Sequence, residues 1–541
     1  MSGPVLDIRD LTIPLPGGGD RAHAVEALSL TVAPGETVCL VGESGSGKSL
    51  TALSIMGLSP HRLLRPIAGS SIRLLDEELV GAAPARLRAL RGSRMAMIFQ
   101  EPMTALNPVA TVGEQIAEVL RWHVEKLPAT EIAKRVRQLM DDVRLPDPAS
   151  LAHAYPHQLS GGQRQRIMIA MALALDPALL IADEPTTALD VTTQAQILAL
   201  LRDLKARRNT GVLFITHDFG VVREIADRVL VMRWGRLVEQ GPADQVLNAP
   251  THAYTKLLIA AVPDAVPPPR SAPTGATILA VDGLAKTYGG HGFVRRQRQV
   301  AAVADAGFTL RRGEILGVVG ESGSGKSTLA RCVARLIEPS SGSILLDGTD
   351  IARLPERQLR PLRQRVQVVF QDPYRSLNPR RTVGASIMEG PRNFGTAPAA
   401  ALATARALMA LVGLEPDALD RLPHQFSGGQ RQRLCIARAL ALEPDLLIAD
   451  EAVSALDVSV QAQVLDLLDD LRRRLSLAIL FITHDLRVAA RLCDTVAVMQ
   501  AGRIVEQGPT AELFARPQHA YTQALFAASP GRREATAGLV G

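Results

Sequence analysis

One phosphate-binding loop is written twice in this chain of 541 residues. The pattern G-x-x-x-x-G-K-[ST] occurs at 42–49 and again at 320–327, both times as Gly-Glu-Ser-Gly-Ser-Gly-Lys-Ser. Each copy follows a short apolar run typical of a buried strand, Thr37–Val41 and Ile315–Val319. The glycines allow backbone N–H groups to surround a phosphate at a helix N-terminus, where the lysine meets the outer phosphates and the serine meets Mg²⁺. Two intact copies predict a protein that binds two nucleotides.

The repetition extends far beyond the two loops. Ser160 and Ser427 each begin a Ser-Gly-Gly-Gln-Arg-Gln-Arg segment, and Asp183 and Asp450 each follow the run Leu-Leu-Ile-Ala. The members of each pair lie 267 residues apart. This constant offset predicts a tandem duplication of one domain, because the repeats of solenoid proteins span only some tens of residues.

We predict a first domain at 1–262, a linker at 263–276, a second domain at 277–529 and a loose tail at 530–541. The linker is rich in proline and has no apolar periodicity, which is typical of a semi-extended connection. The tail is polar and built of small residues, as loose chain ends often are.

Each half alternates β-rich runs with helical patterns, and this predicts an α/β fold with a parallel sheet. Residues 102–166 and 373–433 have helical periodicity and predict a helical subdomain beside each sheet. Hydrophobic residues make up 47% of the chain, enough for two large cores. No apolar run reaches the ~18–20 residues of a membrane span, so we expect contact with a membrane only through a partner.

Charge and cysteine usage favour a cytoplasmic protein that does not bind nucleic acid directly. The net charge is +6, but the arginines are scattered, and an aromatic content of 3% leaves few platforms on which bases could stack. The first residues of the sequence lack the basic segment and apolar core of a secretory signal, so we expect none. Its four cysteines lie far apart in apolar segments, which predicts buried thiols in a reducing compartment: Cys39, Cys332, Cys435 and Cys493.

Polar side chains at the ends of apolar runs supply the chemistry. Asp183 and Asp450 would hold Mg²⁺ through water, and the glutamates that follow them, Glu184 and Glu451, would polarise the attacking water. His217 and His484 each follow a Leu-Phe-Ile-Thr strand and would lie near the γ-phosphate. Gln100 and Gln371 would ligate Mg²⁺ and position water without adding charge.

The Ser-Gly-Gly segments offer a second anion site, because each has backbone N–H groups and a hydroxyl at the start of a helix. A half that already carries a phosphate loop has no internal need for another such site. Each segment is therefore predicted to close on the nucleotide held by the opposite half.

With these motifs in this order, the chain resembles the ATP-binding-cassette (ABC) family over its full length. The resemblance implies two P-loop domains, each with a RecA-like parallel-sheet core, a helical subdomain and an antiparallel β subdomain. It implies a head-to-tail pair of cassettes with two ATP and Mg²⁺ between them. The Ser-Gly-Gly segments at 160–163 and 427–430 are called the signature segments below. The first site would combine the second signature segment with Lys48, Asp183, Glu184 and His217, and the second site would combine the first signature segment with their counterparts.

The resemblance also assigns roles to individual residues. Catalysis would use Glu184, His217, Glu451 and His484, and Mg²⁺ would be held by Ser49, Gln100, Asp183, Ser327, Gln371 and Asp450. Nucleotide would be bound by Gly42, Ser44, Gly45, Ser46, Gly47, Lys48, Ser49, Leu50, Gln100, Ser160, Gly161, Gly162, Gln163, Asp190, Tyr288, Gly320, Ser322, Gly323, Ser324, Gly325, Lys326, Ser327, Thr328, Gln371, Ser427, Gly428, Gly429, Gln430 and Asp457.

Less specific motifs resemble the fused ATPase subunits of peptide-type importers: Leu-Asn-Pro after each glutamine, Pro-His-Gln before each signature, and His-Ala-Tyr-Thr near each domain end. This resemblance implies two permease subunits, an extracytoplasmic binding protein and a peripheral place on the cytoplasmic face of the inner membrane. A twin-cassette ATPase acting on ribosomes or nucleic acid, and a fused sugar-importer ATPase, are the alternatives. The short linker and the intact second cassette weigh against them.

The two halves depart from the family pattern differently. Tyr288 stands where an aromatic ring usually stacks on adenine, whereas alignment places Leu15 there in the first half. Leu50 replaces the hydroxyl residue that Thr328 supplies. We therefore expect two working sites of unequal affinity. Some relatives bind an iron–sulfur cluster after each cassette, but neither corresponding segment here contains cysteine, so we expect none.

Overall fold

The computed structural model describes residues 3–16, 21–124, 126–187, 189–270, 272–289, 299–454 and 456–529. The chain forms two compact units, the first comprising Met1–Leu189 and Thr193–Ala261, the second comprising Val262–Gly541 with Asp190–Thr192. The predicted tail at 530–541 lies outside the described residues.

The first unit is built on a six-stranded sheet with the order β10-β9-β3-β8-β7-β6. Five neighbouring strands are parallel and β10 is antiparallel to β9. Its strands are β3 (Thr37–Val41), β6 (Met95–Ile98), β7 (Leu179–Asp183), β8 (Gly211–Thr216), β9 (Arg228–Arg233) and β10 (Arg236–Pro242). Every residue of β3, β6, β7 and β8 is buried, which explains their continuous apolar sequences.

A separate antiparallel sheet of this unit has the order β2-β1-β4-β5. Its strands are β1 (Leu6–Pro14), β2 (His23–Val32), β4 (Ser71–Leu74) and β5 (Glu77–Glu78). Alternating residues of β1 and β2 are buried, so that one face of the sheet contributes Leu6, Ile8 and Leu28 to the core of the unit.

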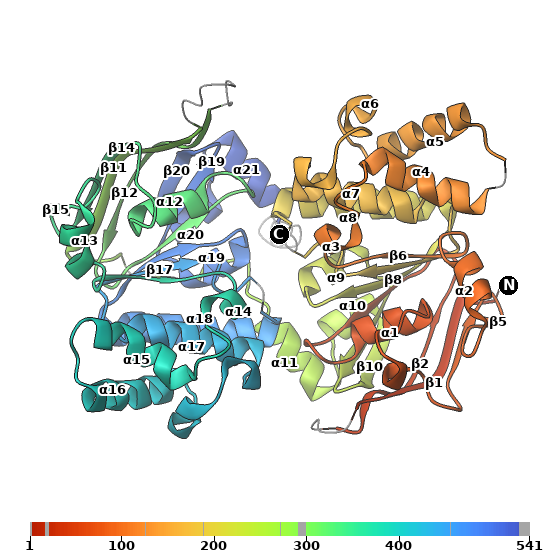
Figure 1. Cartoon of the computed structure of the whole chain (residues 1–541), viewed down its shortest axis with the longest axis horizontal. Coiled ribbons are helices and arrows are strands. Elements are labelled where there is room, and N and C mark those ends of the chain that lie inside the picture. Colours follow the sequence, from red (N-terminus) through yellow and green to blue (C-terminus); the bar gives the residue numbers. More distant parts are fainter. Residues whose placement is uncertain are drawn as a thin grey trace, which may run out of the picture. The chain divides into compact units, whose positions relative to one another are not determined.

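Helices complete the first unit, and α3 to α7 form the predicted helical subdomain (Figure 1). Within it α3, α4 and α5 pack on α7, which in turn packs on β6 at the sheet edge. The helices are α1 (Lys48–Ile55), α2 (Pro84–Leu90), α3 (Pro102–Ala105), α4 (Val112–His123), α5 (Ala129–Asp142), α6 (Pro148–Leu151), α7 (Gly161–Ala172), α8 (Val191–Arg208), α9 (Phe219–Ile225), α10 (Ala243–Asn248) and α11 (Ala253–Ala261).

The second unit repeats this plan, but its strands join in one ten-stranded sheet, β15-β14-β11-β12-β20-β19-β13-β18-β17-β16. A single pairing of Asp305 with Arg503 links its antiparallel part to its largely parallel part. The strands are β11 (Thr277–Tyr288), β12 (Val300–Arg311), β13 (Ile315–Val319), β14 (Ser341–Leu346), β15 (Thr349–Asp350), β16 (Val366–Val369), β17 (Leu446–Asp450), β18 (Ala478–Ile482), β19 (Thr495–Gln500) and β20 (Arg503–Pro509).

The helical subdomain of the second unit comprises α14 to α17, and α17 packs on β16. Thr382 caps α15 by accepting the N–H of Ala385, as Thr111 caps α4 by accepting that of Glu114. The helices are α12 (Lys326–Val333), α13 (Glu356–Leu362), α14 (Pro373–Ser376), α15 (Val383–Asn393), α16 (Pro398–Leu411), α17 (Gly428–Leu440), α18 (Val458–Leu475), α19 (Leu486–Leu492), α20 (Thr510–Ala515) and α21 (Ala520–Ala527).

The described part of the predicted linker contains no helix or strand. Its Arg270 guanidinium lies 3.2 Å from the carboxylate of Asp494 and donates to the carbonyl of Arg491, so this part is attached to the second unit.

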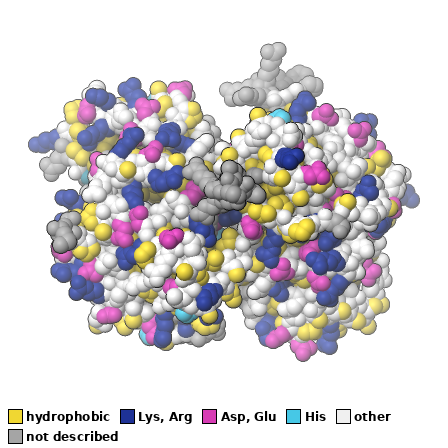
Figure 2. Space-filling view, turned by 180° about the vertical axis from the view of Figure 1, so that it is seen from behind, with side chains coloured by type: hydrophobic (Ala, Val, Ile, Leu, Met, Phe, Trp, Pro, Cys, Tyr) yellow, Lys and Arg dark blue, Asp and Glu magenta, His cyan; other side chains and the backbone are white. Residues whose placement is uncertain are grey.

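Among the described residues, no helix is both long and apolar enough to cross a bilayer. Lys and Arg are interspersed with Asp and Glu on the face in Figure 2.

Candidate active site

The phosphate-binding loops connect β3 to α1 and β13 to α12, as their sequence predicts. Gly47 and Gly325 adopt φ of 104° and 107° immediately before the lysine, and this left-handed conformation favours glycine. The lysine ammonium of each loop donates to two carbonyls of its own loop. Lys48 Nζ lies 2.7 Å from Gly42 O and 2.9 Å from Glu43 O. Lys326 Nζ lies 2.8 Å and 2.7 Å from the corresponding oxygens.

The loop serine and the strand-end aspartate meet in both units. Ser49 Oγ donates to Asp183 Oδ1 at 3.1 Å, and Ser327 Oγ donates to Asp450 Oδ1 at 3.0 Å. Burial of the Asp183 carboxylate raises its pKa to about 6, and burial raises the pKa of Asp450 as well. A hydroxyl and a carboxylate at this position are the oxygen ligands that Mg²⁺ prefers, and a cation there would offset the cost of the buried charge.

The glutamate after each aspartate is held by the predicted glutamine and histidine. Glu184 accepts from Gln100 Nε2 at 2.8 Å, and its other oxygen lies 3.2 Å from His217 Nδ1. Burial opposes ionisation of Glu184, but contacts with His217 and the hydroxyl of Thr187 outweigh it and lower the pKa to about 2. The Glu184 carboxylate is therefore ionised at neutral pH and can accept a proton.

The second unit repeats this arrangement. Glu451 Oε2 lies 2.7 Å from Gln371 Nε2, and Glu451 Oε1 lies 3.3 Å from His484 Nδ1. Against the effect of burial, this contact lowers the pKa of Glu451 and raises that of His484. Both Glu184 and Glu451 adopt positive φ, 46° and 50°, a strained conformation for a residue with a side chain.

The signature segments begin α7 and α17 as reciprocal caps. The hydroxyl of Ser160 accepts the N–H of Gln163, whose side chain accepts the N–H of Ser160, and Ser427 and Gln430 do the same. A Cβ at Gly162 would lie 2.6 Å from the methyl group of Thr193, so glycine is needed for this packing. That each segment acts on the nucleotide of the opposite half stays a prediction.

Strand register supports the predicted difference at the adenine positions. Val25 and Val303 stand at equivalent positions before the two phosphate-binding loops. Ile13 pairs with Val25 in the first unit and Lys286 pairs with Val303 in the second, so Ile13 and Lys286 are equivalent. Two residues further along the chain, Leu15 therefore corresponds to Tyr288. Tyr288 is 43% exposed, and Lys286 Nζ lies 5.4 Å from the centroid of its ring, so the stacking of adenine on Tyr288 stays a prediction. Asp190 and Asp457, predicted to contact nucleotide, immediately precede α8 and α18.

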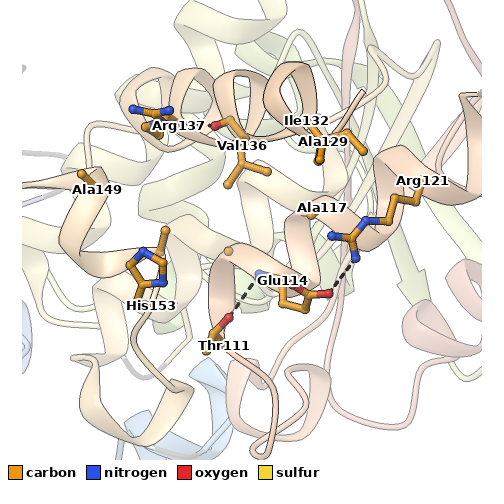
Figure 3. A pocket seen from close by; sticks show the side chains of 13 residues that line it. Thr111, Glu114, Ala117, Arg121, Ala129, Ile132, Val136, Arg137, Ala149 and His153 are labelled. Atoms are coloured by element: carbon orange, nitrogen blue, oxygen red, sulfur yellow. Dashed lines mark hydrogen bonds and ion pairs between the residues drawn. The ribbon is translucent and has the colours of Figure 1, made fainter. Parts of the chain in front are cut away.

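Of two pockets, one lies at residues predicted to bind Mg²⁺ and the other lies away from the predicted nucleotide site. One of about 470 Å³ in the second unit is lined by Ser327, Gln371 and Asp450, and so lies at the predicted Mg²⁺ position. Another, of about 440 Å³, opens between α4, α5 and α6 of the first unit, where Arg121 donates to Glu114 (Figure 3). No residue predicted to bind nucleotide lines the second pocket.

Sequence reasoning missed three features of these sites. Thr187 Oγ1 donates to Glu184 at 2.9 Å, the guanidinium of Arg21 donates to the carbonyl of Gly45, and the hydroxyls of Tyr254 and Tyr521 reach the phosphate-binding loops. The repeated His-Ala-Tyr-Thr motif is the one sequence signal of these contacts, and it indicates the subfamily but not the contact with the loop.

Two phosphate-binding loops, each beside a serine–aspartate pair and a glutamine–glutamate–histidine group, define a protein with two ATP-hydrolysing cassettes. The ABC transporter family matches residues 25–187 and 303–454. A second family, the oligopeptide/dipeptide transporter C-terminal region, matches 238–297 and 505–540. The chain belongs to the ABC transporter family and is an ATP-hydrolysing subunit of its peptide-type importer group.

Curated relatives match nearly the whole chain. Glutathione import ATP-binding proteins GsiA of Salmonella choleraesuis (strain SC-B67) and Escherichia coli (strain K12) are 49% and 48% identical to it, covering 98% of this chain and 90% of theirs. Among solved structures, the dimeric post-hydrolysis state of the ATP-binding cassette MJ0796 bound to ADP and Pi is 28% identical. It covers 44% of this chain and 98% of its own, with a TM-score of 0.40.

Proposed function

We propose that this chain is the motor of an importer for glutathione or related peptides, in which each half binds and hydrolyses one Mg²⁺-ATP. The observation that carries the proposal is the complete, duplicated set of Ser, Asp, Gln, Glu and His side chains. The names of the relatives, which are 47–49% identical over 98% of the chain, support the choice of glutathione.

Each residue has a defined task in this proposal. In the structure, the ammonium groups of Lys48 and Lys326 donate to loop carbonyls. When ATP binds, they donate to the β- and γ-phosphates instead. The oxygens of Ser49, Asp183 and Gln100, and those of their counterparts, would hold Mg²⁺, which would supply positive charge against the phosphates. Glu184 takes a proton from the water whose oxygen attacks the γ-phosphorus while ADP leaves. His217 fixes the orientation of that carboxylate.

The docking surface for a permease is a groove of about 340 Å³ in the second unit, between the catalytic sheet and the helical subdomain. Its lining includes Leu336 after α12, Phe370 after β16, and Gly390 on α15. Leu336 and Phe370 are 46% and 37% exposed, so they offer apolar surface to a partner. Phe370 directly precedes Gln371, which connects the groove to the glutamate of the site.

By this proposal the two units engage two integral-membrane permease subunits, which receive cargo from an extracytoplasmic binding protein. The chain is then a peripheral protein on the cytoplasmic face of the inner membrane. Its cassettes are head-to-tail, with each signature segment completing the site of the other half.

Uptake by cells that lack their own copy of the importer tests this function. Expression of the chain with its two permeases and the binding protein should restore ATP-dependent uptake of labelled glutathione, and the chain and both permeases should purify together. A labelled sugar serves as the control substrate. Association with ribosomes but not with permeases, or uptake of the sugar and not of glutathione, would contradict the proposal.

A further inference from the structure

The two His-Ala-Tyr-Thr segments begin α11 and α21, each the last helix among the described residues of its unit. In each, the histidine caps the helix. His252 Nδ1 accepts the N–H of Tyr254 at 3.1 Å, and His519 Nδ1 accepts that of Tyr521 at 3.2 Å. The cap fixes the tyrosine on the first turn, so that the direction of its side chain is set by the start of the helix.

A glutamate of the last strand anchors the start of each helix. The Glu239 carboxylate on β10 accepts the N–H and hydroxyl of Thr251, at 2.7 and 2.8 Å, and the N–H of His252 at 3.1 Å. Burial opposes ionisation of Glu239, but the neighbouring Thr255 hydroxyl and these donors hold its pKa at about 2. In the second unit, Glu506 on β20 accepts the N–H groups of Gln518 and His519.

The anchored tyrosines reach the phosphate-binding loops. The hydroxyl oxygen of Tyr254 accepts the N–H of Glu43 at 3.3 Å, across 211 residues of sequence. That of Tyr521 accepts the N–H of Glu321 at 3.1 Å, across 200 residues. Tyr254 is 5% exposed, and burial raises the pKa of both phenols, which keeps them protonated.

The loop residue that donates to each tyrosine also accepts a hydrogen bond from the loop lysine. Glu43 donates its N–H to Tyr254 and accepts Lys48 Nζ with its carbonyl, and Glu321 does the same between Tyr521 and Lys326. A continuous path of hydrogen bonds therefore runs from the last strand, through the tyrosine, to the lysine ammonium. Both units contain it, although only the first has Arg233 stacked 4.7 Å from the tyrosine ring.

We propose that Tyr254 and Tyr521 are positioning residues that hold each phosphate-binding loop in its nucleotide-receiving shape, so that the C-terminal region of each unit sets its affinity for ATP. The inference rests on the proposed phosphate contacts of Lys48 and Lys326. Without the tyrosine hydroxyl, the loop gains conformational freedom before ATP binds, and binding must then remove that freedom.

Full-length variants with one intact site test the inference. Lys326→Ala isolates the first site and Lys48→Ala the second. Into each background we introduce Tyr254→Phe or Tyr521→Phe, which keeps the ring and removes the hydroxyl. ATP affinity at the intact site should weaken ~5–30-fold, the range that a free-energy change of one or two kcal/mol produces. Turnover at saturating ATP should change little.

Hydrogen exchange at the loop supplies a readout that global stability does not. Peptides covering Glu43 or Glu321 should exchange faster in the matching Phe variant, and saturating ATP should restore protection. Tyr155→Phe, on an exposed tyrosine of the helical subdomain, is the matched control and should change neither exchange nor affinity. Glu239→Gln, which weakens the anchor, should shift ATP affinity in the same direction as Tyr254→Phe.

Unchanged ATP affinity in both Phe variants would overturn the inference, whether or not the melting temperature falls. A drop in melting temperature alone would assign the tyrosines to structural packing. If the lysine variants bind ATP at both sites as well as the wild type does, the failure lies instead in the proposed phosphate contacts. The two hypotheses can therefore be separated.

Discussion

At the scale of single residues, the two sites have the same geometry but not the same surroundings. The distances from glutamine and histidine to the glutamate agree within about 0.1 Å between units. In the first unit, Thr187 adds a hydroxyl donor to the Glu184 carboxylate, whereas Ser454 in the second donates to the backbone carbonyl of Glu451. Both glutamates are therefore ionised at neutral pH and held by the same two partners, with one additional donor in the first site.

Glu184→Gln combined with Glu451→Gln should nearly abolish ATP hydrolysis while leaving ATP binding intact. The amide cannot accept the proton of the attacking water, and loss of a general base typically costs ~10²–10⁴-fold in rate. Phosphate release measured beside equilibrium ATP binding checks both parts. Turnover of the double variant at the wild-type rate would exclude these glutamates from catalysis.

At the scale of elements, the sequence predicted those parts that depend on neighbours along the chain. The apolar runs before the loops correspond residue for residue to β3 and β13, and Asp183 and Asp450 end β7 and β17. The four cysteines are free and buried, as predicted. The path from Glu239 to Tyr254 and Glu43 could not be predicted, because it joins segments far apart in sequence that only the folded unit brings together.

Leu336→Glu should impair uptake without lowering the ATPase rate of the purified chain. The substitution replaces an exposed apolar side chain with a charged one in the groove between α12, β16 and α15, where we expect a permease helix. The apolar contact with that helix is then lost, and docking must remove water from a carboxylate. Leu402→Glu on α16 is the matched control, since Leu402 is an exposed leucine of the same unit that does not line this groove. Uptake and ATPase rate are measured for both variants, and equal uptake would exclude the groove as the docking surface.

At the scale of the whole molecule, both units contain the serine, aspartate, glutamine, glutamate and histidine to which we assign catalysis and Mg²⁺ binding, and they differ at two positions predicted to contact the nucleotide. Tyr288 and Leu15 occupy corresponding strand positions, as do Thr328 and Leu50 at the starts of α12 and α1. The sequence alone predicts these two differences in residue type, because the two halves of the repeat can be aligned with each other. The contact of Arg21 with Gly45 in the first loop was not predicted, because the two residues are separated in sequence and meet only in the folded unit.

The chain should bind two ATP with unequal affinity, the second site being the tighter. Adenine can stack on Tyr288, and stacking of a base on an aromatic ring contributes ~1–3 kcal/mol, whereas Leu15 offers only an aliphatic contact. Titration of ATP against Lys48→Ala and Lys326→Ala measures each site separately in the full chain. In the Lys48→Ala background Tyr288→Ala should weaken binding, and in the Lys326→Ala background Leu15→Tyr should strengthen it. Equal affinities of the two isolated sites, with no response to either substitution, would show that adenine is held by groups other than these two side chains.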